Sequence, residues 1–373
     1  MTQGAQGAEK SAALHSALRA WYEHARRDLP WRRGHDPYAI WLSEVMLQQT
    51  RVETVIPYYN RFLQEFPTVM ALAEAPLDRV LEHWSGLGYY RRARMLHEGA
   101  RVIAARGVFP KEVAELRDVP GIGPYTAGAV ASIAFGQRAA LVDGNVARVL
   151  ARLFALDHDI RGGAGLARVW KLADVLVAED DPGGWNQALM ELGSTVCTVR
   201  DPRCLLCPVA PLCEAKARGV EKNLPILSPK PRPRSVREVA LVASSGDAVL
   251  LARRCPNGLF GGLWEPPLLE METDLEEARQ AAVVLASAFG VELTSIEDRG
   301  TITHTLSHRR MRVEVMWGQA RSLGELRCGL SIYDKAERVP WTELSGRGRS
   351  SLASKILGAL PRQTGYSRGP SVS

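Results

Sequence analysis

The stretch LRDVPGIGPYTAGAVASIAFG, residues 116–136, decides the fold of the first half of the chain. Its two ends have helical character, and the turn PGIG, residues 120–123, places Pro124 at the first position of a second helix. Because glycine has no Cβ, the backbone at Gly121 and Gly123 can approach a phosphate closely. The N–H groups that open the second helix can then bind that anion. The stretch predicts a phosphate-binding helix–turn–helix, although the same pattern also suits two helices that only pack together.

An aspartate follows the hairpin: Asp143 comes twenty residues after Gly123, in the sequence DGN. Apolar residues then recur with the spacing i, i+3, i+4, i+7, which predicts a helix over residues 145–156. The place of Asp143 directly before this helix is typical of an N-cap. Its place after the hairpin also makes it a candidate for a functional role.

Composition narrows the class of protein. The 373 residues suffice for two or three domains, and the net charge of +6 favours a polyanionic partner. Residues 1–10 lack the apolar stretch of a signal peptide, and no apolar run reaches about 18 residues. We therefore expect a cytoplasmic protein with no membrane span.

The cysteines are unevenly distributed, since four of the six fall within seventeen residues. A disulfide scaffold would spread them through a small secreted domain, so this clustering indicates a metal site in a reducing compartment. Zinc is one candidate for four thiolates. A single C-x2-C pair with three unequal gaps better suits a [4Fe–4S] cluster. The candidate ligands are Cys197, Cys204, Cys207 and Cys213.

The composition and the predicted secondary structure of the chain change after the cysteine cluster. Residues 14–218 read as short helices, with Asp36 as an N-cap before Pro37 and later helices punctuated by prolines such as Pro57. Residues 216–237 hold seven Lys or Arg and four prolines, as expected of an extended linker near phosphates or of a plain solvated tether. Beyond it, strands are predicted over 237–243, 248–253 and 311–317, with a helix over 275–289.

A carboxylate interrupts an apolar helical segment, WLSEVMLQQT, residues 41–50, within the helix predicted over 38–49. Glu44 lies one turn from Trp41 and from Leu47. Partial desolvation among such neighbours favours the protonated carboxyl, the form that a general acid needs near neutral pH. The alternative is an exposed glutamate at the rim of an amphipathic helix.

These motifs, in this order, closely resemble adenine DNA glycosylases of the MutY type, in the iron–sulfur branch of the helix-hairpin-helix DNA glycosylase superfamily. LPW (29–31), GLGYY (86–90) and LVDGNVARVL (141–150) match as well, and the resemblance extends from about residue 21 to 360. It implies a mainly α N-terminal region plus an α+β Nudix-like C-terminal domain. The implied parts are an iron–sulfur lobe (1–30 and 138–218), a six-helix lobe (31–137), a linker (219–235), an 8-oxoguanine recognition domain (236–362) and a disordered tail (363–373).

The resemblance also assigns roles. Glu44 would protonate N7 of a flipped adenine, and Asp143 would stabilise the cationic sugar, with Tyr125 and Asn145 positioning these two. Tyr89 would be a wedge at the mismatch, followed by arginines that hold the DNA backbone. The other residues expected to bind substrate are Arg32, Gln48, Gln49, Gly121, Gly123, Leu306, Ser307 and His308.

Tyr125 bears on the reaction type. The related endonuclease III branch has a lysine at this position as a Schiff-base nucleophile, and tyrosine cannot form that imine. We therefore expect a monofunctional glycosylase. In the C-terminal domain the sequence HTLSH, residues 304–308, matches the family's 8-oxoguanine loop, with Leu306 in place of the usual Phe. Residues 261–290 lack the glutamate pattern of a working Nudix hydrolase, so this domain is expected to recognise rather than hydrolyse.

The expected partner is duplex DNA with an 8-oxoguanine:A or G:A mismatch, bound by a monomer that contains a [4Fe–4S] cluster and is nucleoid-associated if bacterial. Three alternatives stay open. One is an oxidised-pyrimidine glycosylase and lyase of the endonuclease III type. The others are a nucleotide hydrolase that uses the C-terminal domain and a non-catalytic iron–sulfur DNA sensor.

Overall fold

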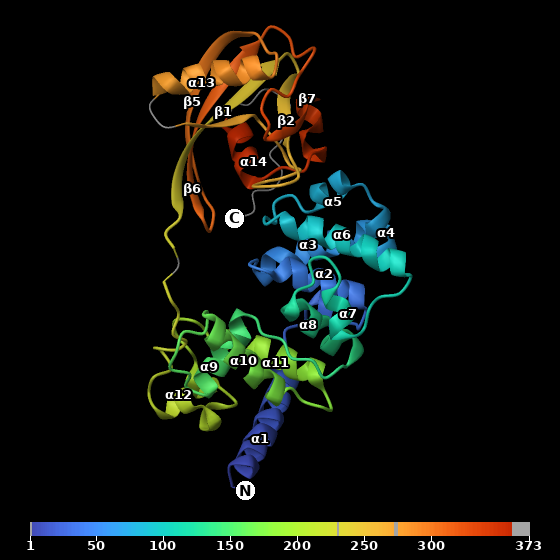
Figure 1. The fold of residues 1–373 in the computed structure, drawn as a ribbon, viewed down its shortest axis with the longest axis vertical. Helices are drawn as coiled ribbons and strands as arrows, with labels where there is room; N and C mark the ends of the chain where they lie inside the picture. Colours follow the sequence, from blue (N-terminus) through green and yellow to red (C-terminus); the bar gives the residue numbers. More distant parts are fainter. Residues whose placement is uncertain (1, 230, 272–274, 360–373) are drawn as a thin grey trace. The chain divides into compact units, whose positions relative to one another are not determined.

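The computed structural model of the chain describes residues 2–229, 231–271 and 275–359 (Figure 1). The chain divides into two compact units. The first comprises Met1–Glu74 and Met95–Lys230, and the second comprises Ala75–Arg94 and Pro231–Ser373. The first unit is helical and the second contains a sheet, which confirms the predicted mainly α region followed by an α+β domain.

Helices build the first unit. In chain order they are α1 (Thr2–Ala25), η1 (Pro30–Arg32), α2 (Pro37–Leu47), α3 (Val52–Glu65), α4 (Val69–Glu74), α6 (Arg91–Arg106, whose first turn belongs to the second unit), α7 (Val113–Arg117), α8 (Pro124–Phe135), α9 (Gly144–Leu153), α10 (Gly163–Leu176), α11 (Pro182–Thr195), η2 (Cys204–Leu206), η3 (Ala210–Leu212) and α12 (Glu214–Ala217).

Local sequence signals begin some of these helices where they were predicted, but several helix ends differ. The carboxylate of Asp36 accepts a hydrogen bond from the Tyr38 N–H at 3.1 Å, with Pro37 at the first position of α2. The hairpin is formed by α7 and α8. Helix α9 ends at Leu153, three residues before its predicted end. The prediction that Pro57 separates helices is wrong, because Pro57 lies inside α3.

Helices α8 and α9 lie at the centre of the first unit. Helix α8 packs against α2, α7 and α11, whereas α9 packs against α10, α11 and α12. Every residue of α9 from Val146 to Leu153 is buried. The loops that lead into α8 and α9 therefore lie between neighbouring helices, and both loops contain candidate site residues.

The second unit is a mixed sheet with helices on both faces. Its elements are α5 (Leu77–His83), β1 (Arg234–Ser245), β2 (Ala248–Arg254), β3 (Trp264–Glu265), β4 (Leu268–Met271), α13 (Leu275–Ala288), β5 (Leu293–Thr305), β6 (Arg309–Ala320), β7 (Tyr333–Pro340), η4 (Trp341–Gly346) and α14 (Ser351–Gly358). The strand order is β3-β2-β1-β6-β5, with β4 beside β1 and β7 beside β2. The β1–β6 pair is parallel and the other pairs are antiparallel.

One sequence prediction about the sheet is wrong. The alternation of residues 311–317 predicts a strand with one exposed face, yet Glu314 and Met316 are buried. Strand β6 lies between β1 and β5, and α13 covers the face that includes Met316 while α14 covers the other (Figure 1). The carboxylate of Glu314 is stabilised there by Arg312 at 3.0 Å and by the Thr301 hydroxyl.

The structure bears on the predicted linker but not on the predicted C-terminal tail. Within the predicted linker, Leu224 is buried against Ala155 and Ala215, so this part packs on the first unit. The predicted tail over 363–373 lies outside the described residues, and the predicted domain boundaries stay predictions.

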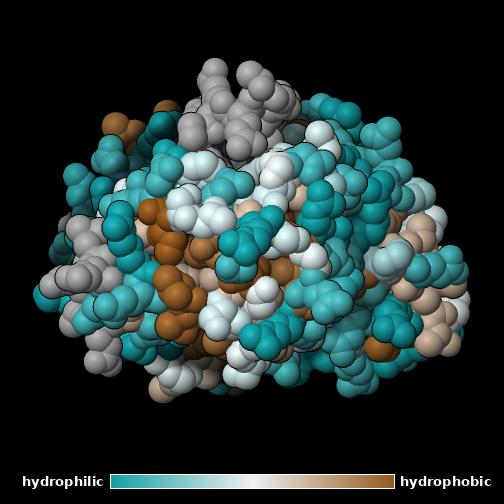
Figure 2. Space-filling view, turned by 90° about the horizontal axis from the view of Figure 1, so that it is seen from above, coloured by the Kyte–Doolittle hydropathy of each residue, from teal (hydrophilic) through white to brown (hydrophobic). Residues whose placement is uncertain are grey.

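No helix in the described part of the chain is long and apolar enough to cross a membrane. Figure 2 shows a face that is largely hydrophilic around a band of hydrophobic residues.

Candidate active site

A cavity of about 830 Å³ opens within the first unit. Its walls come from residues near η1 and α2, from the hairpin before α8, from the start of α9 and from α11. It brings together nine of the residues selected from the sequence. These are Arg32, Glu44, Gln48, Gln49, Gly121, Gly123, Tyr125, Asp143 and Asn145.

Glu44 lies on α2 with 5% of its surface exposed. Burial raises the pKa of its carboxyl to about 7, and the nearby charge of Asp143 acts in the same direction. The hydroxyl of Tyr125, on α8, donates a hydrogen bond to Oε2 of Glu44 and opposes this shift. Near neutral pH, Glu44 is therefore divided between a protonated form that can give a proton and a carboxylate that can accept one.

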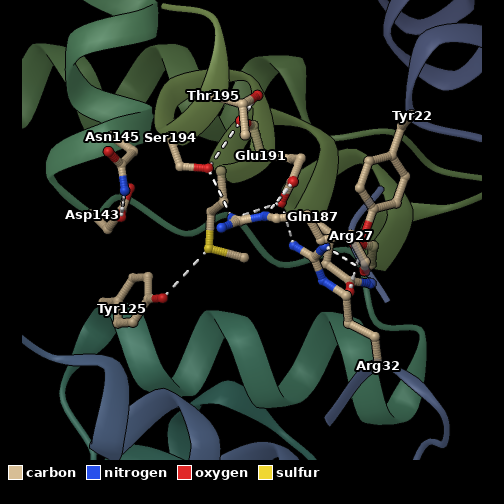
Figure 3. Close-up of polar contacts among 12 residues, drawn as sticks. Tyr22, Arg27, Arg32, Tyr125, Asp143, Asn145, Gln187, Glu191, Ser194 and Thr195 are labelled. Atoms are coloured by element: carbon tan, nitrogen blue, oxygen red, sulfur yellow. Dashed lines mark hydrogen bonds and ion pairs between the residues drawn. The ribbon is translucent and has the colours of Figure 1, made fainter. Parts of the chain in front are cut away.

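Asp143 has the position of an N-cap and also faces the cavity. Its Oδ1 accepts from the Val146 N–H at 2.7 Å. Its Oδ2 accepts from Nδ2 of Asn145 at 2.9 Å, as Figure 3 shows. Burial raises the pKa of Asp143 above its ordinary value, and the hydrogen bonds from Val146 and Asn145, which stabilise the carboxylate, reduce this rise without cancelling it. The capping interpretation and the functional interpretation of this residue are thus compatible.

The side chain of Asn145 is itself fixed. Its Oδ1 accepts from Nη2 of Arg148 at 2.9 Å. The Arg148 guanidinium, which is buried, also donates to the carbonyl oxygens of Gly193 at 2.7 Å and Cys197 at 2.8 Å. A continuous set of hydrogen bonds thus joins the Asp143 carboxylate to the backbone at the first cysteine of the cluster loop.

The hairpin turn has the backbone that its glycines permit. Gly121 has a φ of +82°, and a Cβ there would lie 2.7 Å from the Cβ of Met95, so only glycine fits. Gly123 is the N-cap of α8, where no side chain in the described part of the chain caps the helix, and a Cβ there would meet nothing. The start of α8 is thus open to an anion at Gly123.

A buried carboxylate on α11 was not predicted from the sequence. The side chain of Glu191 is fully buried and forms hydrogen bonds with Arg27 at 2.7 and 3.1 Å and with Arg32 at 2.8 Å (Figure 3). Burial raises the pKa of Glu191, but these arginines outweigh it and hold the pKa below its usual value. All three residues line the cavity. The sequence feature that could have identified Glu191 is its position between the apolar residues Leu189 and Leu192, a pattern similar to the one around Glu44.

The four clustered cysteines are half-buried at the end of α11 and in the loop that follows it. Burial raises the pKa of the Cys207 thiol to about 11, and the other three thiols interact with it electrostatically. Arg152, with 2% of its surface exposed, donates to Sγ of Cys197 at 3.3 Å. In the described part of the chain, no three His, Cys, Asp or Glu side chains are gathered into a ready-made metal site.

The remaining candidate residues belong to the second unit. Tyr89 is 48% exposed, at the tip of the loop that precedes α6. Two of the arginines after it, Arg92 and Arg94, donate to protein carbonyls, among them those of Gly88 and Gly261.

Leu306, Ser307 and His308 form the turn between β5 and β6. Ser307 and His308 are exposed, whereas Leu306 packs against the core that α14 covers. The second unit thus presents two exposed features selected from the sequence, the Tyr89 loop and the polar part of this turn.

Comparison with known proteins agrees with this architecture. Residues 42–172 match the HhH-GPD superfamily of base excision DNA repair proteins, and residues 238–358 match the NUDIX domain. A thermostable thymine-DNA glycosylase structure covers 57% of this chain and 99% of its own, with a TM-score of 0.52 and 30% sequence identity.

Several relatives are named adenine DNA glycosylase, and two of them illustrate the match. The Arabidopsis thaliana protein is 40% identical over 81% of this chain, which spans 56% of that relative. The Rattus norvegicus protein is 37% identical over 81% of this chain and 70% of its own length. The resemblance predicted from the motifs is thereby confirmed, and the chain belongs to the adenine DNA glycosylase family.

Proposed function

We propose that this chain is a monofunctional DNA glycosylase of base excision repair that removes adenine mispaired with 8-oxoguanine or guanine in duplex DNA. One observation supports this above the others: Glu44 and Asp143 line the same cavity, burial raises the pKa of Glu44 to about 7, and hydrogen bonds from Val146 and Asn145 oppose the rise that burial causes in the pKa of Asp143. A pair of carboxyl groups, one able to give a proton near neutral pH and one whose anion accepts hydrogen bonds, suits cleavage of a glycosidic bond.

Glu44 is proposed as the general acid. A stacked adenine is inaccessible, so the nucleotide must first leave the duplex and enter the cavity. Protonation of N7 by Glu44 then makes the base a better leaving group. The Tyr125 hydroxyl orients the carboxyl, since it donates to Oε2. Gln48, Gln49 and Arg32, which line the same cavity, are proposed to contact the nucleotide.

Asp143 is proposed to stabilise the positive charge that develops on the sugar as the bond to the base breaks. A water molecule then adds to C1′ of the sugar and loses a proton, which leaves an abasic site. The N–H groups of Val146 and Asn145 favour the ionised form of Asp143. A carboxylate fixed beside the cation stabilises that charge without rearranging. Gly121 and Gly123 are proposed to hold a phosphate of the same DNA strand at the hairpin.

A lyase activity of the endonuclease III type is disfavoured by the cavity wall. Imine formation with the sugar needs an amine, and no lysine is found among the described residues that line this cavity. The corresponding position holds Tyr125. Borohydride trapping should therefore give negligible cross-linking to DNA, whereas efficient trapping would show that the monofunctional assignment is wrong.

The preference for 8-oxoguanine is proposed to reside in the β5–β6 turn, where Ser307 and His308 are exposed. Tyr89 is proposed as the wedge at the mismatch, because it is an exposed aromatic at a loop tip. Leu306, which packs inward, is not available in this structure as a second wedge.

The four cysteines are proposed to hold a [4Fe–4S] cluster. Four cysteines within one loop, with the Arg152 guanidinium donating to Sγ of Cys197, fit an anionic cluster of thiolate ligands. When bound, the cluster would cross-link residues 197–213. Purified protein should absorb at about 400 nm, which a zinc site does not do.

A single-turnover assay on a duplex with one 8-oxoguanine:A pair tests the function. Wild type should excise adenine, and Glu44→Gln should lose at least about a hundredfold in rate, the usual worth of a general acid, while DNA affinity is kept. Glu98→Gln, which changes an exposed carboxylate on α6, is the control and should behave as wild type. Excision by Glu44→Gln at the wild-type rate would refute the mechanism, and no excision by wild type would refute the function.

A further inference from the structure

The loop that presents Tyr89 is part of the same compact unit as the C-terminal domain, although more than 140 residues separate them in the sequence. The hydroxyl of Tyr90 donates a hydrogen bond to the carbonyl oxygen of Arg349 at 2.5 Å. The hydroxyl of Ser85 donates to the same oxygen at 3.1 Å. One backbone carbonyl of the C-terminal domain thus receives hydrogen bonds from both ends of the loop.

Packing reinforces this connection. A Cβ on Gly348 would lie 3.1 Å from the Cβ of Leu81, on α5, so the backbone next to Arg349 is in close contact with the segment. Asp78 pairs with Arg253 of β2 at 3.6 Å, and the Arg94 guanidinium donates to the carbonyl of Gly261. Residues 75–94 are therefore attached to the C-terminal domain at several points.

The Tyr90 hydroxyl also determines the shape of the loop. It accepts a hydrogen bond from the Gly86 N–H at 3.1 Å while it donates to Arg349, and the Tyr90 side chain is 6% exposed. Across the loop, Nε1 of Trp84 donates to the carbonyl of Gly88 at 3.0 Å. The same hydroxyl thus closes the loop and links it to the C-terminal domain.

The loop needs such support because its backbone is strained at its tip. Gly86 and Gly88 have φ values of +98° and +74°, which glycine tolerates. Tyr89 has a φ of +49°, a left-handed conformation that carries a steric cost for a non-glycine residue. The surrounding hydrogen bonds must offset that cost, so loss of one of them should let Tyr89 leave this conformation.

We propose that Tyr90 is a positioning residue that couples the Tyr89 wedge to the C-terminal recognition domain through the carbonyl of Arg349. This inference rests on the proposed function and extends it. The Tyr89 loop and the β5–β6 turn belong to the same compact unit. The element proposed to probe the mismatch and the element proposed to bind 8-oxoguanine therefore keep a fixed position relative to each other. Selection of 8-oxoguanine:A over G:A then depends on this link.

The test compares single-turnover rates on 8-oxoguanine:A and G:A duplexes. Tyr90→Phe removes the hydroxyl and keeps the ring, and Gly348→Ala places a Cβ 3.1 Å from Leu81 and so displaces the backbone next to Arg349. Loss of one hydrogen bond of about 1 kcal/mol corresponds to a factor of about five. We expect both variants to lower the ratio of the two rates about fivefold. Ser85→Ala should lower it less, because Tyr90 still donates to the carbonyl.

Tyr38→Phe is the matched control, since the Tyr38 hydroxyl is buried and donates to the carbonyl of Phe66 at 2.9 Å in the first unit. A loss of stability alone would reduce both rates in proportion, so this control should keep the wild-type ratio. An unchanged ratio in both Tyr90→Phe and Gly348→Ala would overturn the proposal. An equal fall of the ratio in Tyr38→Phe would do the same.

Amide hydrogen exchange gives a readout that does not depend on activity. In Tyr90→Phe, exchange should become about fivefold faster both in residues 86–90 and in residues 346–350, and Tyr38→Phe should leave both segments unchanged. Faster exchange in the loop alone would show that the link to Arg349 does not exist. If wild type excises no adenine, the proposed function fails, the role in mismatch selection falls with it, and exchange alone decides whether Tyr90 links the two segments.

Discussion

The side chain of Asn145 donates from Nδ2 to Oδ2 of Asp143 across 2.9 Å, and Arg148 holds the other end of the amide at 2.9 Å. The orientation of Asn145 is thereby determined, because only its nitrogen can face Asp143 while its oxygen accepts from Arg148. Asn145 thus fixes the Asp143 carboxylate, which is proposed to stabilise the sugar cation, and Arg148 fixes Asn145.

Replacement of Asn145 by alanine should therefore slow adenine excision with little change in DNA affinity. A hydrogen bond to a charged group is worth about 1.5–3 kcal/mol, which corresponds to a loss in the single-turnover rate of about ten- to a hundredfold. Asn60→Ala, at an exposed position on α3, is the control. A wild-type rate for Asn145→Ala would mean that the Asp143 geometry does not depend on this contact.

Glu44→Gln should stabilise the protein at alkaline pH. The pKa of Glu44 in the folded chain is about 7, above its ordinary value of 4.5, so the unfolded chain loses this proton first as pH rises. The free energy of unfolding therefore decreases as pH rises from 4.5 to 7, and above pH 7 it is lower by about 3 kcal/mol. The variant lacks this penalty.

Thermal midpoints of the helical unit, measured from pH 5 to 9, test this. The difference between Glu44→Gln and wild type should be small at pH 5 and should grow in favour of the variant through pH 7. A constant difference across this range would show that the Glu44 carboxyl does not titrate as its burial requires. Glu98→Gln should show no such trend.

The Tyr125 hydroxyl offers a test of the proton donor itself. Its hydrogen bond lowers the pKa of Glu44, so Tyr125→Phe should raise that pKa further. The activity that depends on protonated Glu44 should then persist to higher pH, although the maximal rate falls because the carboxyl is less well oriented. The alkaline limb of the pH–rate profile should move to higher pH in Tyr125→Phe. Tyr38→Phe should leave that limb in place, and a shift to lower pH in Tyr125→Phe would contradict the assignment.

Part of the site was predictable from local sequence, whereas Arg32, Gln48, Gln49, Tyr125 and Asn145 were selected only through the family resemblance. Gly121 is required by a positive φ in a turn, and Asp143 begins a helix, so each leaves a signature within a few residues of sequence. Glu44 could be selected because its apolar neighbours lie one helical turn away. The outcome is a cavity that holds every first-unit residue selected from the sequence apart from the cysteines.

The rest depends on contacts between residues distant in the chain. The partners of Glu191 lie 164 and 159 positions before it, and the partner of Tyr90 lies 259 positions after it. A single sequence without related sequences does not indicate such pairs. The prediction of an exposed Glu314 was wrong for a similar reason. The alternation of side chains describes a single strand and does not show that helices cover both faces of the sheet.

Arg152 should be essential to the cysteine loop. Its guanidinium donates to the carbonyls of Thr198 at 2.6 Å, Val199 at 3.1 Å and Leu224 at 2.9 Å, besides Sγ of Cys197. Arg152→Met would leave one buried and three partly buried acceptors without this donor, at a cost of several kcal/mol in total. We expect loss of the absorbance at about 400 nm relative to total protein. Arg138→Met, which removes an exposed arginine that donates to one carbonyl, should keep it.

Glu191 should matter for stability in a pH window opposite to that of Glu44. Arg27 and Arg32 hold the pKa of Glu191 below its ordinary 4.5, so the unfolded chain binds the proton first as pH falls. The stabilisation is therefore fully present above pH 4.5 and is lost as pH falls through the lower pKa of the folded chain. Removal of a buried partner costs about 3 kcal/mol, and Glu191→Gln should lower the thermal midpoint accordingly at pH 7. Asp28→Asn, which breaks an exposed pair with Arg33, should leave the midpoint unchanged. Because Arg32 lines the cavity, Glu191→Gln should also weaken binding of the flipped nucleotide; a variant as stable and as active as wild type would show that the two arginines do not need this carboxylate.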